Sequence, residues 1–333
     1  MPQLIFLVSQ PRAGSTLLQR LLGGHSDIHT TAEPWLMLHP IYALRAEGHT
    51  AEYNALLANT ALQDFLATLP TGQAAYDEAL RRMALHLYER ACQGTGKTHF
   101  LDKTPRYYHI LPELGRIFPE ARFLLLLRNP LAVLASQLET NVRGHWLLLA
   151  RYRHDLLTAP RRLLEGQAIL GERALTLHYE DLVTEPRAAL ERACAHLGLP
   201  FEEGMLTYGE HAPPQGRMGD PRNIHRHARP SRASLDKWRR LAHHRQTRHF
   251  AEAYLKALGD DTLHALGYPP DALRAALESI PCTEGRLEVT WEQIFQPDEA
   301  MQKRLALVEL AVLEHRRLVH TWQRWREKRR RRR

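Results

Sequence analysis

The sequence predicts an α/β fold in which a mostly parallel sheet is flanked by helices, with a helical insertion and a long C-terminal helix. Short apolar runs of strand length alternate with amphipathic helical segments along much of the 333-residue chain. The first run, Leu4–Val8, is apolar throughout, which is typical of a strand covered on both faces. A chain of this length can bury a substantial core.

Three further apolar runs complete the predicted sheet: His99–Leu101, Phe123–Leu127 and Ala174–Leu177. Helices are expected directly after three of the four strands, at Thr16–Leu22, Pro130–Leu138 and Pro186–Leu197. Asn129 and Pro130 suit the start of the second of these helices. Asparagine caps free N–H groups there, and proline lacks only an N–H that would have no helical partner.

The other segments are mainly helical. We expect a helical insertion at 34–91, further helix at 147–170 and a helix at 235–258. The segment Gly209–Ser234 has no helical or strand period and is rich in proline, glycine, arginine and histidine. A long loop, either functional or flexible, is predicted there.

A separate helical unit is predicted at the C-terminus. A mostly apolar stripe recurs there at steps of three and four, namely Leu305, Val308, Val312, His315, Val319 and Trp322. This stripe predicts a helix that either packs on its own domain or contacts a partner, which includes a homo-oligomer. The predicted boundaries are a main domain at 1–268, a helical extension at 269–327 and a basic, solvated tail at 328–333.

Composition and charge exclude several classes of protein. The formal net charge is +8, but eight of the basic residues and one glutamate lie from Arg324 onward, so the tail supplies +7 of it. The rest of the chain is nearly neutral, which argues against a nucleic-acid partner. Three widely spaced cysteines (Cys92, Cys194 and Cys282) indicate a reducing compartment. With no signal peptide and no apolar stretch of roughly 18 residues, we expect a cytoplasmic protein without a transmembrane segment.

The loop after the first predicted strand carries the strongest functional signal. Ser9–Thr16 matches the end of the phosphate-binding pattern G-x-x-x-x-G-K-[ST], although Ser9 replaces the first glycine and Ser15 replaces the lysine. Gly14 allows backbone N–H groups to turn toward an anion at the start of the next helix. Arg12 adds a permanent charge. The sequence therefore predicts a P-loop-type anion site; a capped helix without a ligand is the alternative.

The end of the most apolar strand indicates which anion binds. Phe123–Leu127 is followed by Arg128 and Asn129, where a nucleotide kinase would need an aspartate to hold Mg²⁺. A sulfuryl group in transfer carries less charge than a phosphoryl group, so arginine, lysine and N–H donors can stabilise it without a metal.

Several motifs, taken together and in this order, resemble the sulfotransferase family. Gln10–Leu18 looks like its 5′-phosphosulfate loop, and Arg128–Ser136 like its 3′-phosphate site, with an arginine and a serine eight positions apart. His178–Val183 and Leu197–Pro200 resemble its later strand–helix unit, and Arg229–Trp238 its nucleotide-closing segment. The likeness is greatest to tyrosylprotein sulfotransferases and the bacterial enzymes that share their layout.

The resemblance covers roughly residues 4–258 and implies both the donor and the residues that hold it. The donor would be 3′-phosphoadenosine-5′-phosphosulfate, used as a co-substrate without a metal. The implied nucleotide-binding residues are Arg12, Ala13, Gly14, Ser15, Thr16, Arg128, Ser136, Tyr179 and Lys237. From the sequence alone, Tyr179 is equally explicable as a tyrosine at the edge of the core.

By the same resemblance, Glu33 is the general base, and Arg12 and Lys103 stabilise the transferring group. A carboxylate near the cations of the loop suits proton abstraction from an attacking hydroxyl. Glu33 has an alternative role at the start of a helix, because it precedes Pro34. Lys103 has the alternative of pairing with Asp102 or with a surface acid.

The chain also departs from the family's pattern. A second arginine expected in the helix after the 3′-phosphate site falls at Thr140, with Arg143 one turn on, and His109 and His145 are rival bases. The membrane anchor and disulfides of the Golgi members are absent, which argues against assuming a protein-tyrosine acceptor. The acceptor hydroxyl remains open among small molecules, glycans, lipids and peptides. The alternatives in function are a P-loop kinase of a small molecule and a nucleotide-binding scaffold without catalysis.

Overall fold

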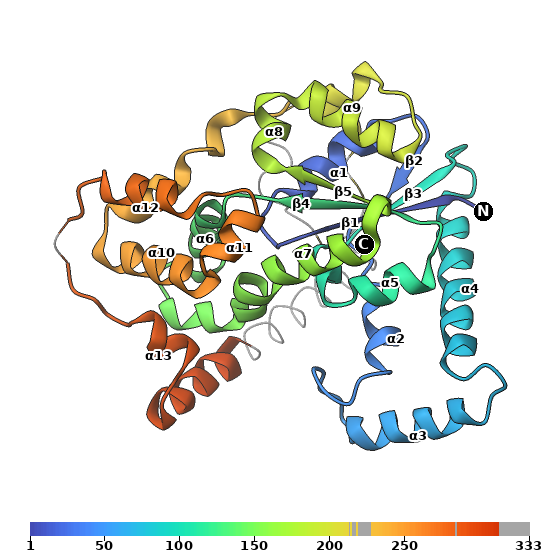
Figure 1. Ribbon diagram of the computed structural model, residues 1–333, viewed down its shortest axis with the longest axis horizontal. Coiled ribbons are helices and arrows are strands. Elements are labelled where there is room, and N and C mark those ends of the chain that lie inside the picture. The colour runs from blue at the N-terminus through green and yellow to red at the C-terminus, as the bar shows by residue number, and fades with distance from the viewer. Residues whose placement is uncertain (213, 215–217, 219–227, 284, 313–333) are drawn as a thin grey trace, which may run out of the picture. The chain divides into compact units, whose positions relative to one another are not determined.

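The computed structural model describes residues 1–212, 214, 218, 228–283 and 285–312. Five strands form one parallel sheet in the order β2-β3-β1-β4-β5 (Figure 1). They are β1 (Gln3–Ser9), β2 (Ile28–Thr30), β3 (His99–Lys103), β4 (Arg122–Leu127) and β5 (Ala174–His178). The predicted α/β fold with a parallel sheet is confirmed. Sequence patterns missed β2, because its three residues include a single apolar one.

The chain divides into two compact units, which are described separately. The first contains residues 1–133 and 158–236, and the second contains 134–157 and 237–333. The first unit holds the whole sheet. The boundaries predicted from sequence at 268 and 327 remain predictions, and the basic tail at 328–333 lies outside the described residues.

In the first unit, helices cover both faces of the sheet. α1 (Ser15–Gly23) and α9 (Pro186–Leu197) lie on one face, and α7 (Ala159–Leu170) lies on the other with α5 (Leu111–Ile117) packed against it (Figure 1). These helices bury apolar stripes on the central strands, so the sheet has no solvent-facing side at its centre.

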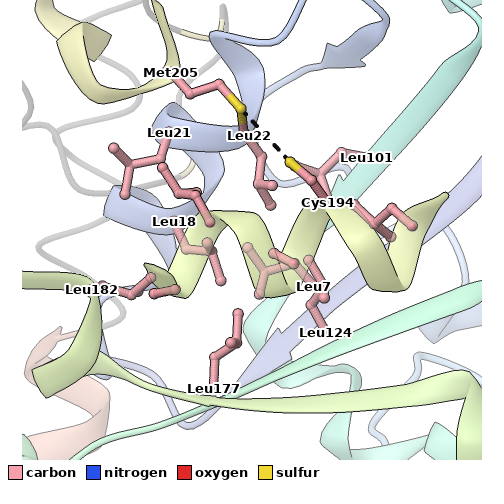
Figure 2. Packing of buried hydrophobic residues seen from close by; sticks show 14 of the residues in the cluster. Leu7, Leu18, Leu21, Leu22, Leu101, Leu124, Leu177, Leu182, Cys194 and Met205 are labelled. Carbon is pink, nitrogen blue, oxygen red and sulfur yellow. Dashed lines mark hydrogen bonds between the residues drawn. The ribbon is translucent and has the colours of Figure 1, made fainter. Parts of the chain in front are cut away.

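Strand alternation divides the buried side chains of β1 between two core layers. Leu7 belongs to the cluster beneath α1 and α9, together with Leu18, Leu177 and Cys194 (Figure 2). Phe6 points to the other face, where its ring lies 5.4 Å from the ring of Phe123 and 5.3 Å from that of Phe118. Both faces of β1 are therefore filled by large apolar groups, which fixes the register of the central strand.

The predicted helical insertion between the first two predicted strands is present. It consists of α2 (Leu38–Tyr42), α3 (Ala55–Ala67) and α4 (Gln73–Cys92), and α4 contacts β3 and α5. Helix α8 (Tyr179–Thr184) follows β5 directly and precedes α9. The helix predicted after β4 is α6 (Pro130–Gln137). The helical signal at 147–170 is divided among two short turns, Trp146–Tyr152 and His154–Thr158, and α7.

The second unit has its own aromatic core. Its helices are α10 (Arg245–Leu258), α11 (Asp260–Ala265), α12 (Pro270–Glu278) and α13 (Trp291–Phe295), and residues 299–312 are also helical. The ring of Trp291 lies 4.2 Å from that of Phe295 and 6.4 Å from that of Phe250, which is itself 5.7 Å from Trp146. The rest of the predicted C-terminal helix lies outside the described residues.

The prediction of one continuous helix at 235–258 is wrong, because the helix is interrupted. The helical turn Lys237–Ala242 ends before α10 begins, because His244 is extended and pairs with Thr283. The amide N–H of Thr283 donates to the carbonyl of His243 at 2.8 Å. This long-range pairing leaves no local signal in the sequence. In the part of the chain that the structure describes, no helix has the length and apolarity needed to cross a membrane.

The packing of the sheet predicts the cost of a cavity at its centre. Leu124→Ala removes a fully buried side chain of β4 and should lower the free energy of unfolding by about 2–5 kcal/mol. Ile169→Ala on α7, where the side chain is 57% exposed, should change it by less than about 0.5 kcal/mol. Urea unfolding followed by circular dichroism measures both. Equal effects would contradict this description of the core.

Candidate active site

The predicted site residues of the first unit follow the carboxyl ends of its strands. The loop 10–14 follows β1, Lys103 ends β3, Arg128 follows β4 and Tyr179 follows β5, while Glu33 comes shortly after β2. Because all five strands are parallel, these ends meet at one edge of the sheet, which is where ligands bind in open α/β sheets.

The loop between β1 and α1 is built to receive an anion. Arg12 and Gly14 both have left-handed backbone conformations, with φ of 76° and 101°, and the amide of Ala13 donates to the carbonyl of Gln10 at 3.0 Å. Among the described residues, no side chain caps α1 at Ser15, and its first turn contains no acidic residue. The first N–H groups of the helix and its positive dipole end therefore suit a negatively charged group.

Tyr179 packs directly against this loop. A Cβ atom added at Gly14 would lie 2.3 Å from Cδ2 of the tyrosine ring, so glycine is required there by space as well as by φ. The Tyr179 ring is 7% exposed, and its hydroxyl lies 2.5 Å from Oγ of Ser234. Tyr179 therefore lies at the loop itself; its contact with a nucleotide remains a prediction.

Arg128 connects the loop to two other segments. Its guanidinium lies 4.1 Å from the centre of the Tyr179 ring, a cation–π contact. It also donates to the carbonyl of Arg12 at 3.0 Å and to that of Ser234 at 3.4 Å. A permanent positive charge is thus held beside the anion-binding loop. Its predicted role as the 3′-phosphate ligand remains a prediction.

Glu33 and Lys103 form a close ion pair, with Nζ 2.6 Å from Oε1. The lysine side chain is 1% exposed and the glutamate side chain 12%. A buried ammonium group is tolerated when it is paired, and Glu33 supplies that partner. Within the described residues Lys103 is thus paired with Glu33 rather than with Asp102 or an exposed acid, and α2 begins at Leu38, so Glu33 does not start that helix. The catalytic roles of both residues remain predictions.

The indole of Trp35 holds the other oxygen of the same carboxylate. Its Nε1 donates to Oε2 of Glu33 at 3.0 Å. Trp35 has φ 52°, a left-handed conformation that costs a residue with a side chain roughly 1–2 kcal/mol. Strained backbone of this kind is often found at functional sites. Both carboxylate oxygens of Glu33 are therefore held in place.

A second carboxylate, Asp102, is buried beside Lys103 in a very different environment. Its Oδ2 accepts hydrogen bonds from the hydroxyls of Tyr88 at 2.6 Å and Tyr107 at 3.0 Å, and its Oδ1 accepts one from Thr104 at 2.8 Å. Burial raises the pKa of Asp102 to about 6, although the three hydroxyl donors act in the opposite direction.

Two predicted residues lie in the second unit. Ser136 is in α6, and the division between the units falls after Val133 in that helix; Lys237 begins the second unit's main segment. The role of Ser136 at the 3′-phosphate and that of Lys237 as a nucleotide contact remain predictions. Arg143, the candidate second arginine, donates to the carbonyl of Thr140 at 2.9 Å and lies in the same unit, as does the rival base His145.

Two residues beside the candidate site were missed from the sequence, and the role of His109 remains untested. The ring of His109, the second rival base, packs 4.2 Å from that of Tyr108 and 6.3 Å from that of Tyr42. Trp35 and Ser234 were not singled out, although both lie in segments that resemble the family. An aromatic residue two positions after a candidate base is a signal that would have identified Trp35.

Several known proteins are similar to this chain in sequence. The model of the family described as "Sulfotransferase family" matches residues 2–203. The nodulation protein NoeE of Sinorhizobium fredii is 32% identical over 298 residues, covering 80% of this chain and 66% of its own length. Protein-tyrosine sulfotransferase 1 of Danio rerio is 24% identical over 211 residues, covering 62% and 56%. The chain thus spans between half and two thirds of these relatives.

Among solved structures, the sulfotransferase domain from the curacin biosynthetic pathway is 24% identical with a TM-score of 0.49, and covers 72% of this chain and 90% of its own. The domain from the Synechococcus PCC 7002 olefin synthase is 28% identical with a TM-score of 0.48, and covers 72% and 87%.

The contact between Gly14 and Tyr179 predicts an unequal effect of two glycine substitutions. Gly94 also has a positive φ, 79°, but the described residues leave open space around it. Gly94→Ala should therefore cost only the backbone strain, about 1–2 kcal/mol. Gly14→Ala should cost about 1–3 kcal/mol more, because the tyrosine ring has to move. Chemical denaturation of the two variants tests this. If Gly14→Ala is no worse, the ring does not lie on the loop.

The environment of Asp102 predicts a pH dependence of stability. Its native pKa of about 6 lies above the ordinary 3.8, so the unfolded state ionises first as the pH rises. The contribution of Asp102 to the free energy of unfolding should be greatest below about pH 4 and mostly lost by about pH 6. The total loss is roughly 1.4 kcal/mol for each unit by which the native pKa exceeds the unfolded pKa. The free energy of unfolding of wild type, relative to Asp102→Asn, should therefore fall over this interval. Asp64→Asn, in exposed α3, is the control. A flat difference would contradict the assignment.

Proposed function

Because the chain belongs to the sulfotransferase family, we propose that it transfers a sulfuryl group from 3′-phosphoadenosine-5′-phosphosulfate to an acceptor hydroxyl. The observation that carries this proposal is the Glu33–Lys103 ion pair at the same sheet edge as an anion-binding loop. A base and a buried cation at that edge are what an acceptor and a transferring anion require.

The residues around the loop fit an adenosine phosphosulfate. Two left-handed residues, Arg12 and Gly14, turn the loop around the start of α1, whose N–H groups would hold the 5′-phosphosulfate. Arg128, fixed over Tyr179, supplies a cation for a second phosphate. In this proposal Ala13, Ser15 and Thr16 complete the phosphosulfate loop.

The reaction would be a single in-line displacement. The acceptor oxygen forms a bond to sulfur, its proton passes to the carboxylate of Glu33, and the bond between sulfur and the bridging phosphate oxygen breaks. Adenosine 3′,5′-bisphosphate leaves. Arg12, Lys103 and the loop amides stabilise the charge on the sulfuryl and phosphate oxygens, and holding both substrates in line supplies much of the acceleration. We expect side-chain cations to serve where a kinase uses a metal.

The rival functions are less well supported. A kinase would use Asp102 or Asp181 for Mg²⁺. However, both oxygens of Asp102 already accept hydroxyl hydrogen bonds, and Asp181 lies 3.8 Å from Arg192. A scaffold without catalysis gives no reason for the buried Glu33–Lys103 pair. The relatives' names concern nodulation and protein tyrosine, so the acceptor remains a hydroxyl of a small molecule, glycan, lipid or peptide.

Two substitutions should separate proton transfer from phosphate binding. Glu33→Gln should lower kcat by roughly 10² to 10⁴, because an amide cannot take the proton at neutral pH. Its affinity for adenosine 3′,5′-bisphosphate should barely change. Arg12→Ala should weaken both affinity and turnover. Turnover is measured with labelled donor over a panel of acceptors, and affinity by calorimetry.

Glu52→Gln, an exposed glutamate of the helical insertion, is the matched control and should leave both quantities unchanged. An acceptor with an acidic hydroxyl should partly restore turnover in Glu33→Gln, since it needs less help in losing its proton. Near wild-type turnover of Glu33→Gln with an alcohol would disprove the base. Transfer from ATP and Mg²⁺ instead of the phosphosulfate would favour a kinase.

A further inference from the structure

A buried chain of hydrogen bonds runs from Asp102 to the backbone of the segment that carries Glu33. The Tyr107 hydroxyl donates to Oδ2 of Asp102 at 3.0 Å and accepts the amide N–H of Met37 at 3.1 Å. Asp102, Tyr107 and Met37 are all at most 1% exposed. We propose that these hydrogen bonds position Glu33 for proton transfer. The inference rests on the proposed function and adds positioning residues to it.

The segment between Glu33 and Met37 needs such support. Trp35 lies between them in a left-handed conformation, which residues with side chains rarely adopt. Strained backbone of this kind persists when the surroundings hold it at both ends. On one side, Glu33 is held by Lys103 and by the indole of Trp35. On the other side, the Tyr107 hydroxyl holds the amide of Met37.

Asp102 determines which group donates in each of these hydrogen bonds. An ionised carboxylate accepts hydrogen bonds and donates none, so Tyr107 has to direct its single hydroxyl proton toward Asp102. The oxygen of that hydroxyl is then available to accept the Met37 N–H. Asp102 also adjoins Lys103 in β3, so the same strand end supplies the partner of Glu33 and the start of the chain that holds its backbone. Loss of the Tyr107 hydroxyl should therefore move the Glu33 carboxylate away from its place beside Lys103.

Tyr88 offers a matched comparison inside the same cluster. Its hydroxyl donates to the same oxygen of Asp102 at 2.6 Å, and its side chain is 3% exposed. It comes from α4, however, and its hydrogen bond is to Asp102 rather than to the Glu33 segment. Each Tyr→Phe change removes one buried donor to Asp102, but Tyr107→Phe alone also removes the acceptor of the Met37 amide.

The experiment compares Tyr107→Phe with Tyr88→Phe in the full chain. With an alcohol acceptor, Tyr107→Phe should lower kcat about tenfold or more, and Tyr88→Phe about twofold or less. The Kd for adenosine 3′,5′-bisphosphate should stay within about twofold in both, since that ligand does not require a placed base. The loss in Tyr107→Phe should shrink with an acidic hydroxyl acceptor, which a merely structural defect would not show.

A second variant reaches the same hydrogen bond from its other end. Because Met37 is fully buried, Met37→Ala, which keeps the amide N–H, is the control for the lost side chain. Met37→Pro removes the amide N–H itself, and the native φ of −89° lies within about 25° of the proline value. It should lower kcat with the same dependence on acceptor acidity, and it decides the matter if Tyr107→Phe does not fold.

Equal losses of kcat in the two Tyr→Phe variants, or a loss that ignores acceptor acidity, would overturn the positioning role. Either outcome would leave the proposed function intact, provided that wild type is active and Glu33→Gln is not. A wild-type chain that binds the nucleotide but transfers to no hydroxyl would overturn both.

Discussion

The parallel pairing of β1 with both β3 and β4 is the constraint on which the site depends. Register places Leu7 opposite Lys103 and Ser9 opposite Leu126, so the strands end within two residues of one another at the same edge. The loop after β1, the lysine of β3 and the arginine after β4 are therefore placed at the same edge by the strands themselves. The two faces of β1, filled by leucines on one side and aromatic rings on the other, hold that register.

The two cations Lys103 and Arg128 lie in different environments. Lys103 is buried and takes its counter-charge from Glu33, whereas Arg128 lies over an aromatic ring and binds backbone carbonyls. The two neighbouring carboxylates also have different surroundings. Glu33 faces a cation, and Asp102 is surrounded by hydroxyls, where burial raises its pKa to about 6. The proposed function assigns proton transfer to Glu33 alone, and the hydrogen bonds of Asp102 join β3 to α4 and to the turn that follows β3.

Much of this was predictable from sequence, for physical reasons. Apolar runs identified the four long strands, and the Arg–Gly–Ser–Thr sequence identified a strand–loop–helix turn as the candidate anion site, because both signals are local. The pairing of Lys103 with Glu33 and the packing of Tyr179 on Gly14 were not predictable, since they join segments distant in sequence. The surroundings of Asp102 were not predictable either, because no sequence pattern shows which hydroxyls surround a buried carboxylate. The break at His243 arises in the same way, from a partner forty residues on.

The contact of Tyr179 and Arg128 with the loop has a consequence for how the protein folds. The loop belongs to the first strand, yet its surroundings come from the fourth and fifth strands and from Ser234 near the end of the unit. Contacts so remote along the chain carry a large loop-closure entropy and form late. The surroundings of this loop are therefore incomplete in any partly folded or nascent chain that lacks β5. If the loop binds the proposed nucleotide, the ligand should stabilise only the completed unit, slowing its unfolding without hastening its formation.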